Sequence, residues 1–105
     1  MARMLVAFSI APSVSGPDGG VAEAVAGAVR VVRESGLPHE TNAMFTNLEG
    51  EWDEVMAVVK RCVDVLAERS PRVSLVLKAD VRPGRTDQLS AKVERIERLL
   101  DGGQG

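Results

Sequence analysis

The stretch from Arg72 to Val81 constrains the fold most, because its side chains alternate in character along its whole length. The odd-numbered positions from 73 to 81 are all apolar, whereas the even-numbered positions carry Ser74, Val76, Lys78 and Asp80. A period of two predicts a β-strand with one face in the core and the other open to solvent, a ligand or a partner. Lys78 and Asp80 share the open face, and we expect them to pair with each other or across an interface.

The first half of the chain carries further strand and helix patterns. An apolar run at residues 4–10 predicts a strand, which ends at a loop rich in Gly, Ser and Pro over residues 13–20. Apolar residues recur at helical spacing from Val21, and Gly36 stands where a glycine favours the end of a helix. Residues 39–48 predict two short extended pieces or one strand with an irregular hairpin.

Two more helices are predicted after this point. The first spans about residues 51–69, with an apolar stripe made of Trp52, Val55, Met56, Val59, Val63 and Leu66. The second follows a turn at residues 82–85, and its inward face is expected to carry Leu89, Val93, Ile96 and Leu100.

The order strand, helix, strand, strand, helix, strand, helix is the split βαβ pattern with one extra helix. We therefore predict an α+β fold, a βαββαβ sandwich whose antiparallel sheet is covered on one face by two helices, with an additional C-terminal helix. At 105 residues the chain is expected to form a single domain over residues 1–101, with a flexible tail at 102–105. The uncovered sheet face predicts self-association as a dimer or tetramer.

Composition narrows the functional classes. The formal net charge is −2, and basic residues are scattered among acidic ones, which disfavours a nucleic-acid partner. No segment offers the ~20 apolar residues that a bilayer span needs, so no membrane partner is expected. Cys62 is the only cysteine, which excludes an internal disulfide and favours a cytoplasmic protein with a buried thiol. His39 has no neighbouring second ligand, and neither a metal nor a cofactor is expected.

The segment from Thr41 to Glu54 is the candidate binding site. Small polar side chains lead there into an acidic helix start that carries the only tryptophan, Trp52. Asn42, Thr46 and Glu49 are equally compatible with ordinary turn or strand-face roles. Trp52 fits the apolar stripe of its helix better than it fits a ligand contact.

Three motifs in this order resemble the thiamine-binding protein family, formerly a domain of unknown function. They are Ser9–Pro12, Glu49–Met56, and Arg72–Gly84 followed by Lys92-Val93, and together they extend over nearly the whole chain. The resemblance implies a ferredoxin-like fold, assembly into dimers or tetramers through the sheets, and a pocket for thiamine or its hydroxymethylpyrimidine part. Phe45 stands where many family members have a small residue, so a reshaped pocket is expected.

The implied ligand calls for a carboxylate near its cationic thiazolium, hydrogen-bonding groups along the aminopyrimidine edge and an apolar wall. On this interpretation Glu49 meets the cation or the pyrimidine edge, and Ser9, Asn42 and Thr46 supply hydrogen bonds. Trp52 would lie against the ring in a cation–π contact.

The expected function is a non-catalytic small-molecule binding protein that acts as a carrier, buffer or sensor. No nucleophile–base pair is recognisable, and Ser9 lacks a Gly-x-Ser-x-Gly context, which disfavours an enzyme. The alternative is a ligand-free interaction or regulatory subunit, or a small enzyme, because this scaffold hosts many unrelated activities.

Overall fold

The computed structural model describes residues 3–12, 21–42, 44–83 and 88–102. Its elements follow the chain as β1 (Arg3–Pro12), α1 (Val21–Glu34), β2 (His39–Thr41), β3 (Thr46–Glu51), α2 (Trp52–Ala67), β4 (Val73–Val81) and α3 (Gln88–Gly102). The predicted α+β fold, with its βαββαβ order and extra C-terminal helix, is thus confirmed. The predicted loop at 13–20, the second half of the turn at 82–85 and the tail beyond Gly102 lie outside the described residues.

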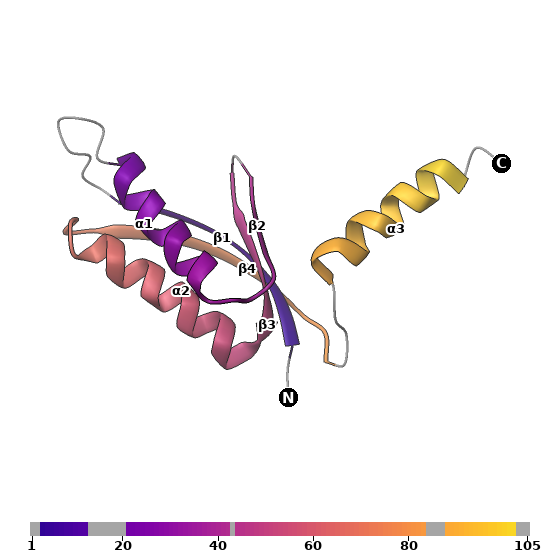
Figure 1. The fold of residues 1–105 in the computed structure, drawn as a ribbon, viewed down its shortest axis with the longest axis horizontal. Helices are drawn as coiled ribbons and strands as arrows, with labels where there is room; N and C mark the ends of the chain where they lie inside the picture. Colours follow the sequence, from indigo (N-terminus) through magenta and orange to yellow (C-terminus); the bar gives the residue numbers. More distant parts are fainter. Residues whose placement is uncertain (1–2, 13–20, 43, 84–87, 103–105) are drawn as a thin grey trace.

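The four strands form one antiparallel sheet in the order β2-β3-β1-β4. β1 is a central strand, which pairs with β3 from Arg3↔Glu51 to Phe8↔Thr46 and with β4 as far as Pro12↔Val73. Figure 1 shows α1 and α2 packed together against this sheet, and both helices contact β1. After α1, Gly36 adopts a φ of 75°, the left-handed conformation expected of the glycine that ends a helix.

Alternation along β1 determines which face of the sheet is the core. Met4, Val6 and Phe8 are buried, whereas the residues between them are partly exposed. The buried side chains pack against apolar residues of α1, β3 and α2, namely Ala28, Val32, Leu48, Val55, Val58, Val59, Cys62 and Leu66. The two helices therefore cover one face of the sheet and leave the other without them.

The position of Trp52 differs from the prediction. Trp52 is the first residue of α2, and 48% of its surface is exposed. The buried stripe of α2 consists of Val55, Val58, Val59, Cys62 and Leu66. At 3.6 residues per turn, Trp52 lies roughly 60° around the helix from the middle of that stripe. The prediction of a core tryptophan was wrong because the true stripe runs through Val58 and Cys62, further round the helix.

α3 projects away from the sheet and the other helices (Figure 1). Its predicted inward face was wrong at three positions, because Val93, Ile96 and Leu100 are 52%, 58% and 67% exposed. The described hydrogen bonds between α3 and the sheet all lie at its N-terminal end. The apolar stripe of α3 therefore continues outward along a helix whose apolar side chains stay largely exposed in the described part of the chain.

Glu49 holds the N-terminal end of α3 against the sheet. Its side chain is 2% exposed, and its Oε2 accepts a hydrogen bond from the backbone N–H of Gln88 at 2.9 Å. Its Oε1 accepts a second hydrogen bond from the N–H of Leu89 at 3.1 Å. Such N–H groups have no partner within their own helix, and the helix dipole favours a negative charge there. Glu49 of β3 thus caps a helix that begins far along the chain.

A second contact joins α3 to β4. Lys92 Nζ donates a hydrogen bond to Asp80 Oδ2, and Arg82 Nε lies 3.9 Å from Asp80 Oδ1. The hydrogen bond from Lys92 holds the pKa of the Asp80 carboxyl below its usual value. Asp80 therefore pairs with Lys92 and Arg82 within the chain, and not with Lys78, which was one of the two pairings that we expected.

We predict that Glu49→Gln loosens α3. An amide has one acceptor oxygen and a donor NH₂, so it cannot accept hydrogen bonds from both backbone N–H groups. The free energy of unfolding should fall by about 1–3 kcal/mol, as measured by urea denaturation, and amide hydrogen exchange should accelerate across α3. Glu40→Gln on β2, where the side chain is exposed, is the matched control. Unchanged exchange in the Glu49→Gln variant would show that Glu49 does not hold the helix.

Candidate functional site

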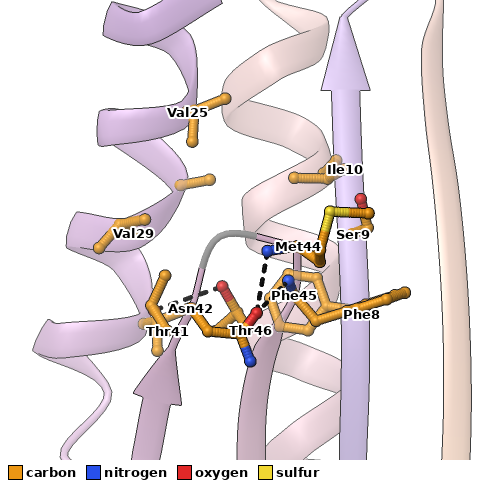
Figure 2. Close-up of a pocket in the computed structure, with 12 residues that line it drawn as sticks. Phe8, Ser9, Ile10, Val25, Val29, Thr41, Asn42, Met44, Phe45 and Thr46 are labelled. Atoms are coloured by element: carbon orange, nitrogen blue, oxygen red, sulfur yellow. Dashed lines mark hydrogen bonds between the residues drawn. The ribbon is translucent and has the colours of Figure 1, made fainter.

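A cavity of about 220 Å³ lies where α1, β1 and the β2–β3 hairpin meet (Figure 2). We call it the neutral cavity, because none of its described lining side chains is charged. It is lined by Phe8, Ser9 and Ile10 of β1, by Val25, Ala28, Val29 and Val32 of α1, and by Thr41, Asn42, Met44, Phe45 and Thr46 of the hairpin. The helix and strand supply an apolar wall, and the hairpin supplies polar groups.

Asn42 shapes the hairpin turn that borders the cavity. Its Oδ1 accepts hydrogen bonds from the backbone N–H groups of Met44 and Phe45, each at 2.9 Å. Its own backbone N–H donates to the carbonyl oxygen of Phe45, also at 2.9 Å. Asparagine is favoured at such turns because its side chain bonds to the backbone a few residues on. The turn role considered for Asn42 is therefore real, and it places Asn42 and Phe45 at the cavity.

Thr41 and Thr46 face each other across the hairpin. They are direct partners in the β2–β3 register, and their Oγ1 atoms are 3.4 Å apart. Thr46 is also the direct partner of Phe8, which is buried in the core. Because direct partners in an antiparallel sheet point to the same face, both hydroxyls lie on the side of the sheet where the cavity opens.

The size and charge of the neutral cavity limit what it can hold. Its volume is below the roughly 300–1,000 Å³ typical of sites for drug-sized ligands. A buried ion without a partner of opposite charge carries a large desolvation cost. The cavity therefore suits one small neutral ring that presents hydrogen-bonding groups along one edge.

Three of the five predicted site residues border this cavity, namely Ser9, Asn42 and Thr46. Ser9 lies between Phe8 and Ile10, so strand alternation directs its hydroxyl to the opposite sheet face and leaves mainly its backbone at the cavity. Glu49 and Trp52 are not among the lining residues. Glu49 caps α3, and Trp52 is exposed at the start of α2.

The sequence analysis placed Thr41 at the start of the candidate segment but gave it no role, and it missed the valines of α1 as cavity residues. Val25 and Val29 belong to the apolar residues that recur at helical spacing after Val21, and spacing alone does not separate a packed position from a cavity wall. For Thr41 a signal existed, because a turn at residues 42–45 pairs it directly with Thr46. The ambiguous hairpin boundaries concealed that pairing.

The described residues offer no competing site for metal or thiolate chemistry. They contain no group of three or more His, Cys, Asp or Glu side chains placed to hold a metal ion. Cys62 is buried as predicted, with its Sγ 3.4 Å from the carbonyl oxygen of Ala28, and burial raises the pKa of its thiol to about 11. Within the same residues, every helix is too short or too polar to cross a bilayer.

Residues 6–97 match the family described as thiamine-binding protein. The chain belongs to the thiamine-binding protein family. A UPF0045 protein of Mycobacterium bovis is 56% identical to it over 98 residues, which cover 92% of this chain and 94% of that protein. The resemblance inferred from the three sequence motifs is thus confirmed.

Two solved structures share the fold. The crystal structure of a hypothetical protein from Methanocaldococcus jannaschii has a TM-score of 0.81 at 31% identity, covering 94% of this chain and 100% of that one. A Thermotoga maritima protein, provisionally assigned to thiamine biosynthesis or salvage, has a TM-score of 0.72 at 26% identity, covering 87% of this chain and 98% of that one.

We predict that Cys62 reacts slowly with thiol reagents while the protein is folded. A pKa of about 11 in place of 9.0 leaves roughly 100-fold less thiolate at pH 8, before any loss of access is counted. Alkylation by iodoacetamide, followed by mass spectrometry, measures the rate, and the urea-unfolded chain is the control. Equal rates in the folded and unfolded chain would contradict the burial of the thiol.

Proposed function

We propose that the protein is a non-catalytic small-molecule binding protein whose ligand is thiamine or its hydroxymethylpyrimidine part. The observation that supports this most is the neutral cavity, which sets the polar groups of Thr41, Asn42 and Thr46 beside an apolar wall. Membership of the thiamine-binding protein family supports the choice of ligand. The fold shared with the Thermotoga maritima protein supports it further.

Within this proposal the cavity takes the aminopyrimidine rather than the thiazolium. Hydroxyls both donate and accept hydrogen bonds, so Thr41 and Thr46 match a ring edge that alternates amino group and ring nitrogen. The aromatic rings of Phe8 and Phe45 offer surfaces for the face of the pyrimidine. A thiazolium cation in the cavity would have no carboxylate partner, so it belongs at the rim, where Met44 is 73% exposed.

Of the five site residues predicted from the sequence, we propose that Asn42 and Thr46 contact the ligand directly. The two turn hydrogen bonds use the Oδ1 of Asn42, so we propose its NH₂ group as a donor to the ligand. Ser9 contributes at the edge of the cavity through its backbone. In this arrangement Glu49 holds the start of α3 and does not contact the ligand, and Trp52 lies outside the cavity.

A binding role suits the lining better than catalysis does. General acid–base catalysis needs an ionisable side chain within reach of the reacting atoms, and the described lining residues contain none. We therefore propose a carrier, buffer or sensor rather than a small enzyme. We also propose a cytoplasmic location, because Cys62, the only cysteine, is a free thiol.

We further propose that the chain forms a dimer or tetramer. Val93, Ile96, Leu99 and Leu100 expose most of their surface on α3, and Val76 is 59% exposed on the open face of the sheet. Apolar surface gathered in this way on a small protein marks an interaction site. An interaction subunit without a ligand, the alternative function, rests on this same surface.

We predict that Thr46→Val weakens binding of hydroxymethylpyrimidine two- to tenfold. The substitution keeps the shape of the side chain and removes one hydrogen bond, which contributes about 0.5–1.5 kcal/mol. Titration calorimetry with hydroxymethylpyrimidine and with thiamine measures the affinities. Ser74→Ala, which removes an exposed hydroxyl from β4, is the control. If the wild-type protein binds neither compound, the proposal fails and the interaction-subunit alternative leads.

We predict a solution mass of two or four times the 11.2 kDa chain by light scattering at micromolar concentration. Ile96→Glu should lower that mass, because it places a charge in the middle of the apolar stripe. Ser90→Glu adds the same charge to the same helix at an exposed polar position and should leave the mass unchanged. A monomeric wild-type protein would rule out self-association.

A further inference from the structure

A second hollow lies beside the neutral cavity and shares part of its wall. It is lined by Val25, Ala26, Val29, Arg30 and Arg33, all of α1, and we call it the arginine hollow. Val25 and Val29 also line the neutral cavity. The uncharged cavity and the surface that carries two guanidinium groups therefore adjoin at this pair of valines.

The two arginines are available to a ligand. Both are exposed, and neither forms an ion pair with another side chain in the described part of the chain. They are three residues apart on one helix, a spacing that puts both side chains on the same side. The described lining of the arginine hollow includes no acidic residue. Its described side chains therefore carry a net positive charge.

The two arginines differ in their other neighbours. Arg30 also borders a groove between α1 and α2, where the acidic residues are Glu23, Glu34 and Glu68. Glu23 forms an ion pair with Arg69, with its Oε2 3.6 Å from Arg69 Nη1. Arg33 borders the arginine hollow and not that groove. Substitution of Arg33 therefore tests the arginine hollow without changing the groove. Arg33 also lies in the last turn of α1, where the helix dipole stabilises a positive charge.

A guanidinium group matches a phosphate in charge and geometry, because its N–H donors can form two parallel hydrogen bonds to phosphate oxygens. A thiazolium, in contrast, would meet two like charges. We propose that the ligand is a phosphate monoester of the hydroxymethylpyrimidine, with its ring in the neutral cavity and its phosphate over Arg30 and Arg33. This inference rests on the proposed function, since it assumes that the cavity holds the pyrimidine ring.

The test compares hydroxymethylpyrimidine with its phosphate monoester by titration calorimetry, using the full chain. In the wild type at low ionic strength, the monoester should bind at least tenfold more tightly. Arg33→Gln should remove most of that advantage and Arg30→Gln/Arg33→Gln all of it, while affinity for the unphosphorylated compound stays the same. The advantage should also shrink as salt is raised, because exposed charges are screened.

Arg61→Gln is the matched control, because Arg61 is exposed on α2 and forms no ion pair with another described side chain. Glutamine keeps a helix propensity close to that of arginine, so all variants should fold. Equal binding of the two compounds by the wild type overturns this inference and leaves the proposed function standing. A phosphate advantage that survives the double substitution also overturns it. If neither compound binds, the proposed function fails and the inference with it.

Discussion

The alternation of side chains along β1 decides where the functional groups of the sheet point. β1 pairs with both β3 and β4, so the burial of Met4, Val6 and Phe8 sets the inner face of both neighbours. Thr46 is the partner of Phe8 and shares its face, whereas Glu49, three residues further along β3, points the other way. A shift of one residue would exchange these faces. The cavity hydroxyls and the cap of α3 thus depend on one register.

That register explains how far the sequence could predict the structure. Strong local patterns, such as the alternation at residues 73–81 and the helix that ends before Gly36, were sufficient to predict which helices and strands form and in what order. Glu49 and Thr46 lie close in the sequence and looked like parts of one site, but strand parity separates them. Trp52 was misassigned because helical spacing leaves the centre of a stripe uncertain by part of a turn. The orientation of α3 depends on Glu49, a contact between distant residues that no local pattern reveals.

The distribution of charge around α1 gives the candidate site its chemical character. The neutral cavity excludes charge because Val25, Val29 and Phe8 surround it, and its polar groups are uncharged hydroxyls and an amide. The charged side chains of α1 lie outside the cavity, with Arg33 beyond the same valines. A ligand that spans both regions must combine a neutral ring with a charged substituent. This division favours an anionic substituent on the α1 side, because no carboxylate occurs among the described residues that line either hollow.

The contacts that hold the start of α3 place the apolar stripe of this helix beside the open face of the sheet. Val93, Ile96 and Leu100 are 52–67% exposed, so covering them contributes on the order of 3–5 kcal/mol per chain, or about 5–11 kcal/mol per dimer. Association costs about 4–15 kcal/mol in lost freedom of motion. The stripe alone therefore barely offsets that cost, and a stable assembly needs the sheet face around Val76 as well. Glu49 and Lys92 hold the start of α3 beside that face, so one partner can cover both surfaces together. A free α3 would present each surface separately, and neither would suffice.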